Sequence, residues 1–314
     1  MNIQWYPGHM TKALRMMEEN IKIIDLVIEI LDARIPLSSK NPDIDTLAKN
    51  KMRLIILNKA DLADETANKA WVSYYEKKGV PVLLYNSKSN EKKTVLVNTI
   101  MDACREKIER DRKRGIINRS VKAMIVGIPN VGKSTFINNL AKRNAAVVGN
   151  KPGVTKGKQW IKIGKNLDLL DTPGILWPKF EDRETGLNIG FIGSINDNIL
   201  PSEELATELI KKLCAIDGKL IGDRYGIDLY KSDESKDSDS GKLYSEISES
   251  EATKGNIQDE FIKPEGILLK IAEARKCYKK GEEPDLKKAA ELFLDDFRSG
   301  KLGRITLELP SEDE

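Results

Sequence analysis

Short apolar runs alternate with amphipathic stretches through the first half of the chain. The runs at residues 25–32, 53–57 and 80–85 are rich in branched apolar side chains, which predicts buried parallel strands. A helical pattern covers residues 63–78, between the last two runs. Strands that alternate with helices of this length are typical of a doubly wound α/β sheet.

The same alternation continues in the next part of the chain. Residues 90–114 predict one long, charged helix. Residues 121–126 then predict a strand and residues 133–141 a helix, and residues 159–163 with 167–170 predict a hairpin. The expected sheet is therefore mostly parallel.

After the hairpin the pattern changes to helices alone. One helix is expected to open at Pro201 with Ser202 as its N-cap, a second at Pro264, and a third after Asp285 that ends near Gly300. A small all-α region is thus expected to follow the sheet. The side chains expected on the buried faces of these helices are Leu205, Leu209, Leu213, Leu268, Ile271, Tyr278, Leu286, Ala290, Phe293 and Phe297.

Composition limits the classes of protein that fit. Apolar residues make up 40% of the chain and charged residues 32%, which is typical of a soluble globular protein. The longest apolar run is broken by Glu29, so no membrane span is expected, and the N-terminus shows no secretory signal. Cys104, Cys214 and Cys277 are few and widely spaced, which favours reduced thiols and a cytosolic protein. Residues 231–256 are rich in Ser, Asp, Glu and Lys, and they predict a mobile insertion because they offer little apolar surface to bury.

Charge is unevenly distributed, although the formal net charge is only +3. No carboxylate occurs between Arg112 and Leu167. A single-sign stretch of this kind predicts attraction to a polyanion, and the alternative is an ordinary solvated basic surface. The basic residues of the stretch are Lys113, Arg114, Arg119, Lys122, Lys133, Lys142, Arg143, Lys151, Lys156, Lys158, Lys162 and Lys165.

A glycine-rich segment joins the strand at 121–126 to the helix at 133–141. It reads Gly127-Ile128-Pro129-Asn130-Val131-Gly132-Lys133-Ser134. In this context backbone N–H groups can surround phosphate oxygens, Lys133 can reach the β- and γ-phosphates and Ser134 can bind Mg²⁺. The residues expected to contact a nucleoside triphosphate here are Asn130, Val131, Gly132, Lys133, Ser134 and Thr135.

A second motif, Asn58-Lys59-Ala60-Asp61, follows the strand at 53–57. The Asn58 amide and the Asp61 carboxylate have the groups to pair with a guanine edge, and the aliphatic part of Lys59 can cover the ring. The alternative is a strand end followed by a plain turn, and the phosphate loop weighs against it. Asn86-Ser87 lies where a second base-contacting loop is expected, or again a simple turn.

The third motif is Asp171-Thr172-Pro173-Gly174, which follows the strand at 167–170. Asp171 is expected to hold the Mg²⁺ shell through water, and the Gly174 N–H to touch the γ-phosphate. Thr155 is the hydroxyl expected to complete the metal shell when GTP is bound. Together the motifs predict a GTPase.

The order of the motifs is inverted, since the guanine motif precedes the phosphate loop. With this order, the segments Asp32-Ala33-Arg34-Ile35-Pro36, Trp5-Tyr6-Pro7-Gly8-His9-Met10 and the Gly-Arg-Ile-Thr run at 303–306 make the chain resemble the circularly permuted ribosome biogenesis GTPase A family, also called YlqF. The resemblance covers almost the whole chain, and the insertion at 231–256 departs from it.

The resemblance implies a bacterial cytosolic GTPase that assists late maturation of the large (50S) ribosomal subunit. It implies a circularly permuted P-loop GTPase domain at residues 1–180 and a helical RNA-binding domain at 181–314. GTP or GDP, the large subunit and its rRNA are the implied partners, with no membrane, and a monomer is expected. Between the domains, residues 175–180 are expected to let GTP bias the orientation of the second domain.

Catalysis raises a separate question, because Ile175 stands where many GTPases have a water-orienting glutamine. Resemblance to GTPases with such an apolar residue implies a retracted side chain. His9, the only histidine, is a candidate catalytic residue in addition to Lys133. The alternative is that His9 packs or caps at the first helix. Asn130 resembles the residue that helps to hold K⁺ in related GTPases, and its simpler role is to shape the turn.

Other classes of function remain open at this point. An RNA-modifying enzyme would need a second catalytic constellation, which the C-terminal region does not show. A switch that binds RNA or a protein outside ribosome assembly is the alternative function, although a signalling switch would not need the carboxylate-free basic stretch.

Overall fold

The computed structural model describes residues 8–89, 93–116, 119–141, 146, 158–178, 180, 182–195, 200–229 and 262–311. The chain divides into two compact units, Met1–Leu205 with Leu294–Glu314, and Ala206–Phe293. This division differs from the expected domain ranges 1–180 and 181–314. Whether residues 1–180 and 181–314 fold as separate domains stays a prediction. The insertion 231–256 and the segment Trp5-Tyr6-Pro7 lie outside the described residues.

The first unit is built around a six-stranded sheet with the order β3-β2-β1-β4-β6-β5. All neighbouring strands are parallel except β5, which is antiparallel to β6. The expected mostly parallel α/β sheet is therefore confirmed. The strands are β1 (Leu26–Asp32), β2 (Met52–Asn58), β3 (Val82–Tyr85), β4 (Val121–Val126), β5 (Gln159–Ile163) and β6 (Leu167–Asp171).

The sheet's central strands are buried along their length, and this explains why they read as continuous apolar runs. β1 pairs with β2 in a register that places Asp32 opposite Asn58. β2 pairs with β3 so that Asn58 lies opposite Tyr85. The carboxyl ends of these strands, and the phosphate loop that follows β4, therefore meet at one edge of the sheet.

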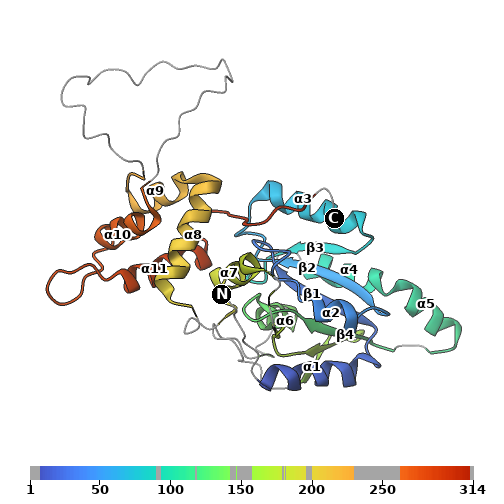
Figure 1. Cartoon of the computed structure of the whole chain (residues 1–314). Coiled ribbons are helices and arrows are strands. Elements are labelled where there is room, and N and C mark those ends of the chain that lie inside the picture. The colour runs from blue at the N-terminus through green and yellow to red at the C-terminus, as the bar shows by residue number, and fades with distance from the viewer. Residues whose placement is uncertain are drawn as a thin grey trace, which may run out of the picture. The chain divides into compact units, whose positions relative to one another are not determined.

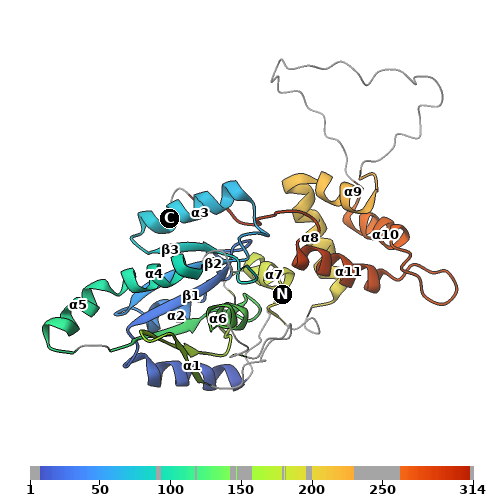
Figure 2. The same cartoon turned by 180° about the vertical axis from the view of Figure 1, so that it is seen from behind.

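Helices lie on both sides of this sheet. Figures 1 and 2 show the strands between α3 on one side and α1 on the other. α6 packs against β5 and β6. The helices wholly within the first unit are α1 (Gly8–Ile21), α2 (Pro42–Leu47), α3 (Glu65–Lys77), α4 (Lys93–Ala103), α5 (Arg105–Lys113), α6 (Lys133–Ala141) and α7 (Arg183–Phe191).

The single long helix expected at residues 90–114 is wrong, because the structure has two helices, α4 and α5, that meet at Cys104. Leu96, Ile100 and Cys104 are all buried at helical spacing, so α4 faces the core. α5 has no buried residues. The helix breaks where the last buried side chain gives way to a predominantly charged segment. The short helices α2 and α7 were not expected from the pattern.

The remaining helices run through the second unit: α8 (Ser202–Asp217), α9 (Lys219–Tyr225), α10 (Pro264–Ala274) and α11 (Leu286–Ser299). α8 begins and α11 ends in the first unit. The three helices expected from Pro201, Pro264 and Asp285 are confirmed, and α9 was missed.

Three details of these helices differ from expectation. Ser202 is the first residue of α8 and its hydroxyl donates to Glu203, so it is not an N-cap. α10 ends at Ala274, which leaves Tyr278 beyond the helix and 44% exposed. Leu286 opens α11 and is also exposed, because the first turn of that helix does not yet face the core. The other expected side chains of these faces are buried.

Two further expectations concern the whole described chain. None of its helices combines the length and the apolar character that a membrane crossing requires. Cys104, Cys214 and Cys277 are free thiols, as expected from their spacing.

Candidate nucleotide-binding site

The phosphate loop needs glycine at two positions because of close backbone packing. Gly127 has φ +146°, and a Cβ there would lie 2.4 Å from the carbonyl oxygen of Ile30. Gly132 has φ +98°, and its Cβ would lie 2.4 Å from Asn58 Nδ2. Neither conformation nor space suits another residue. Asn130 also has a positive φ, +59°, which asparagine tolerates better than most residues.

Lys133 opens α6 and is buried inside the loop. Its Nζ donates to the carbonyl oxygens of Gly127 at 3.0 Å and Ile128 at 2.7 Å. Burial lowers the pKa of Lys133 to about 8, although the charge of Asp171 acts in the opposite direction. The ammonium group is thus held within the loop in which phosphate oxygens are expected.

Asp171 lies at the end of β6 and is also buried. Its Oδ1 has no hydrogen-bond partner among the described residues. Burial raises the pKa of Asp171 to about 6, against the opposing effects of Lys133 and the Thr172 N–H. A buried carboxylate oxygen without a partner fits a role in a cation shell. Ser134, one residue after Lys133 and half-buried, offers the hydroxyl that such a shell requires.

No group of three or more His, Cys, Asp or Glu side chains that could hold a metal occurs in the described ranges. Mg²⁺ usually binds through one or two protein ligands, substrate phosphates and waters. GTPases use Mg²⁺ in this way. Thr155, the expected third ligand, lies outside the described residues.

Asn58 joins three loops of the site. Its Nδ2 donates to the Val131 carbonyl at 2.7 Å, and its Oδ1 accepts from the Ser87 N–H at 3.1 Å and the Ser87 hydroxyl at 2.7 Å. The guanine motif, the phosphate loop and the 86–87 loop are thus brought together as expected. Asn58 uses its amide to hold these loops, whereas Asp61 is exposed. Pairing of Asp61 with guanine stays a prediction.

Lys59 reinforces the same junction. It has a left-handed backbone, with φ +58°, and its Nζ donates to the Asn130 carbonyl and to Asp32 Oδ2, both at 2.8 Å. Burial lowers the pKa of Lys59, and Asp32 opposes this shift. Ala60 follows, and its N–H donates to the Tyr85 carbonyl at 3.1 Å.

The third motif closes over the phosphate loop at Gly174. A Cβ at this position would lie 2.7 Å from both the backbone nitrogen of Pro129 and Lys133 Nζ. Ile175 is buried, which fits the retracted side chain that the resemblance implies, and its carbonyl accepts from Asn41 Nδ2 at 3.2 Å. The isoleucine side chain does not reach solvent beside the loop.

Sequence reasoning missed several residues of the site. The tip of the phosphate loop contacts the segment after α7: the Asn130 amide donates to the Gly193 carbonyl, and the Ser194 hydroxyl donates to the Pro129 carbonyl at 2.5 Å. Asp32 ion-pairs with Lys59, but from the sequence Asp32 was named only as part of a segment that carries the family resemblance. Its place at the end of β1, next to the strand that ends at Asn58, was the available signal.

The His9 side chain, like Thr155, lies outside what the structure describes. His9 is the second residue of α1, but only its backbone is described. Its catalytic role stays a prediction. Asn86 is described, and its Oδ1 accepts from the Lys88 N–H at 2.9 Å, as in an Asx turn.

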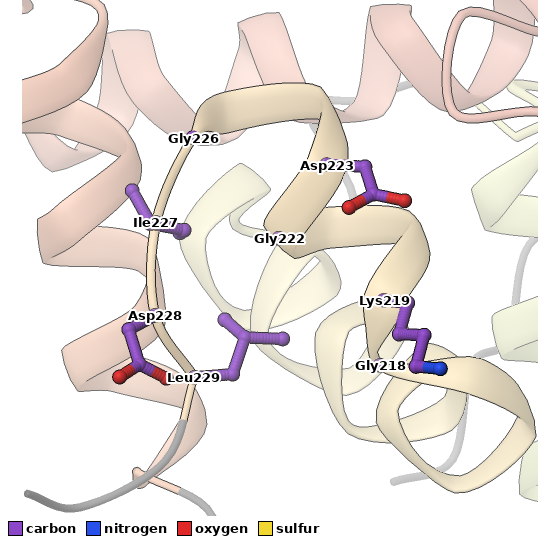
Figure 3. Close-up of a pocket in the computed structure, with 8 residues that line it drawn as sticks. All are labelled: Gly218, Lys219, Gly222, Asp223, Gly226, Ile227, Asp228 and Leu229. Carbon is purple, nitrogen blue, oxygen red and sulfur yellow. The ribbon is translucent and has the colours of Figure 1, made fainter. Parts of the chain in front are cut away.

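A separate small pocket of about 230 Å³ occurs in the second unit (Figure 3). It is formed by α9 and the extended segment after it. None of the residues predicted for nucleotide binding lines it, so it is not the nucleotide site. Its lining residues are Gly218, Lys219, Gly222, Asp223, Gly226, Ile227, Asp228 and Leu229.

Comparisons with known proteins agree with this geometry. The sequence model of a family described as "50S ribosome-binding GTPase" matches residues 122–212. Ribosome biogenesis GTPase A of Bacillus cereus is 40% identical over 312 residues, which cover 99% of this chain and 95% of the relative. This chain belongs to the ribosome biogenesis GTPase A family. The chain is therefore a GTPase.

Other relatives and a solved structure extend the match. Ribosome biogenesis GTPase A of Thermotoga maritima is 30% identical, and 99% of this chain and 95% of that protein are covered. Mitochondrial ribosome-associated GTPase 1 of Mus musculus is 33% identical, with 97% and 90% covered. The crystal structure of GNP-bound YlqF from T. maritima matches with a TM-score of 0.61 and 25% identity over 96% of this chain and 99% of that one. The circularly permuted GTPase fold of the family is thus shared.

Proposed function

We propose that this GTPase is a cytoplasmic, monomeric assembly factor that binds rRNA and assists late maturation of the large ribosomal subunit. The observation that carries the proposal is the joined site, in which Asn58 bonds to both Val131 and Ser87, in a chain of the ribosome biogenesis GTPase A family. Ribosome-assembly relatives at this identity and coverage support the process, and the name of the matching family model supports the large subunit.

Within the site, Lys133 is proposed to move from the loop carbonyls to the β- and γ-phosphates when GTP binds. Ser134, Asp171 and Thr155 would hold Mg²⁺, which neutralises charge that develops on the phosphates. Gly174 lies against the same loop, and its N–H would touch the γ-phosphate.

Water activation requires a group other than Ile175, which is buried and cannot hydrogen-bond. His9 is the proposed group, because an imidazole can orient water or accept its proton near neutral pH. A K⁺ ion beside Asn130 is proposed to share the charge of the phosphates. Equal single-turnover rates for His9→Ala and wild type on ribosomal particles would exclude His9, and equal rates in Na⁺ and K⁺ would exclude the cation.

Only some basic residues of the stretch between Arg112 and Leu167 support RNA binding. Arg119 is ion-paired with Asp25 and Asp111, and Lys133 is buried in the phosphate loop. These cations are therefore not free to attract a polyanion. Lys142, Arg143, Lys151 and Lys156 lie outside the described residues.

The edge strand β5 retains an exposed basic and aromatic surface. Trp160 is 38% exposed, and Lys122 Nζ lies 5.7 Å from the centre of its ring. Lys162 is exposed on the same face of β5 as Trp160, because side chains alternate along a strand, and Lys158 before the strand and Lys165 in the turn after it are also exposed. An aromatic ring among lysines suits an RNA base and its backbone.

Co-sedimentation with large ribosomal subunits tests the proposal. Binding is expected with a non-hydrolysable GTP analogue and weaker binding with GDP. A Trp160→Ala, Lys162→Glu variant should bind less. Lys78→Glu is the control, because Lys78 also lies against an aromatic ring, that of Tyr74 at 4.5 Å, but at the C-terminal end of α3.

The same experiment separates the alternative function. A GTPase switch that acts outside ribosome assembly would bind guanine nucleotides yet show no nucleotide-dependent sedimentation with the subunit. Turnover that the ribosomal particle does not raise would count against the proposal in the same way.

A further inference from the structure

A fully buried ion pair lies next to the guanine motif. Asp32 is 0% exposed and Arg34 is 1% exposed. Arg34 Nε donates to Asp32 Oδ1 at 2.9 Å and Nη2 donates to Oδ2 at 2.8 Å. Such a bidentate pair loses much hydration when it is buried, so it adds little stability by itself. Its position therefore suggests another role.

The carboxylate of this pair also holds the guanine motif. Asp32 Oδ2 accepts from Lys59 Nζ, which donates in addition to the Asn130 carbonyl of the phosphate loop. Arg34 and Lys59 outweigh the effect of burial and hold the pKa of Asp32 well below its usual range. Asp32 is thus ionised and fixes the lysine between two nucleotide-binding loops.

The third nitrogen of the Arg34 guanidinium, Nη1, contacts a segment far along the chain. Nη1 donates to the Phe297 carbonyl at 3.1 Å and the Arg298 carbonyl at 3.4 Å, 263 positions and more after Arg34. The guanidinium lies 5.1 Å from the centre of the Phe297 ring. These carbonyls belong to the last turn of α11, where helix carbonyls lack intrahelical partners and a cation is favourable.

The same turn of α11 is also linked to the tip of the phosphate loop, through residues 190–194. Arg298 donates to the carbonyls of Gly190 and Phe191, both at 3.0 Å. The next residues, Gly193 and Ser194, contact Asn130 and Pro129. All of these residues belong to the first unit. The last turn of α11 is thereby connected to the phosphate loop by two separate routes.

We infer that Asp32 is a positioning residue for guanine-nucleotide binding, and that Arg34 couples it to the last turn of α11. Asp32 holds Lys59 where its stem covers the base and its ammonium stabilises the phosphate loop. Arg34 holds Asp32 and takes its remaining partners from α11. Nucleotide binding and order in residues 294–299 therefore stabilise each other, because such coupling is reciprocal. The inference rests on the GTPase activity but not on the ribosomal role.

Binding of a fluorescent GDP to the full chain tests the positioning role. Asp32→Asn should raise the Kd at least tenfold, with little change in turnover at saturating GTP. Glu308→Gln is the control: Glu308 is a half-buried carboxylate that accepts from the Leu37 and Ser38 N–H groups, but it touches no nucleotide loop. The control should keep the wild-type Kd within twofold. A wild-type Kd in Asp32→Asn would overturn the inference.

Hydrogen exchange tests the coupling, which a merely structural ion pair would not produce. GDP should slow the exchange of residues 294–299 in the wild type and leave it unchanged in Asp32→Asn. Slowing by GDP in both proteins, or in neither, would refute the coupling. A wild type that bound no guanine nucleotide would instead refute the proposed function itself.

A double variant keeps the test valid if Asp32→Asn does not fold. Asp32→Leu with Arg34→Met removes both buried charges together, which proteins tolerate better than the loss of one. It leaves Lys59 without its carboxylate, so the Kd should again rise at least tenfold. A folded double variant with wild-type affinity would overturn the positioning role.

Discussion

Replacement of Asn58 by alanine tests how the nucleotide site is held together. Asn58 is 1% exposed and makes three hydrogen bonds, one to Val131 and two to Ser87. Each such bond contributes about 1 kcal/mol net, so the free energy of unfolding should fall by about 3 kcal/mol. The substitution leaves the buried Val131 carbonyl and the Ser87 hydroxyl without their partner, so the whole loss of about 3 kcal/mol is expected.

Part of the free energy lost in Asn58→Ala should appear as weaker binding of GDP. Without Asn58 the three loops are no longer fixed before the nucleotide arrives, and the nucleotide must order them. If about 1.4 kcal/mol is transferred in this way, the Kd for GDP rises about tenfold. Calorimetric titration of nucleotide-free protein with GDP measures the Kd, and urea unfolding followed by tryptophan fluorescence measures the stability.

Asn188→Ala is the control for Asn58→Ala. Asn188 is equally buried, and its Nδ2 donates to Ser38 Oγ at 3.1 Å and to Glu308 Oε1 at 2.8 Å, away from the nucleotide loops. It should lose stability but keep its affinity for GDP. The reasoning is refuted if Asn58→Ala loses as much stability as the control and still binds GDP within twofold of wild type.

Three further outcomes are expected. Gly132→Ala should weaken GDP binding more than tenfold in the same titration, because φ +98° and the 2.4 Å approach to Asn58 Nδ2 leave no place for a methyl group. Gly174→Ala should reduce affinity for a GTP analogue more than for GDP, since its Cβ would meet the Pro129 backbone at 2.7 Å beside the expected γ-phosphate. Burial raises the pKa of Asp171 to about 6 from 3.8, so its stabilising contribution is present at low pH and is lost as pH rises through 6. Without metal, urea unfolding should show wild type losing about 2 kcal/mol between pH 4 and pH 7 relative to Asp171→Asn.

The sheet and the arrangement of its loops could be predicted from the sequence because their causes are local. Branched apolar runs specify buried strands, and parallel strands place their carboxyl ends at one edge. The motifs at 58–61, 127–134 and 171–174 follow strands, so their meeting followed from the topology. The break at Cys104 was missed because the charged helical pattern continues through it, and only burial distinguishes α4 from α5.

Contacts between distant segments could not be predicted, since no local pattern encodes them. Nothing near Arg119 shows that Asp25 will neutralise it. The run at 303–306 carried the resemblance, but its structural role is a set of long-range bonds: the Ile305 N–H donates to the Leu62 carbonyl, and Thr306 Oγ1 accepts from the Asp64 N–H. The C-terminal segment thereby packs along the loop that follows the guanine motif.

The distance along the chain between Trp71 and its partner has a consequence for biosynthesis. The Trp71 indole N–H donates to the Glu308 carbonyl, 237 positions later, at 2.9 Å. A chain emerging from a translating ribosome exposes the early strands long before this partner is made, although domains tend to fold as they appear. Residues made long after the early strands therefore complete the first unit, and a nascent chain halted before Glu308 would leave that indole unsatisfied.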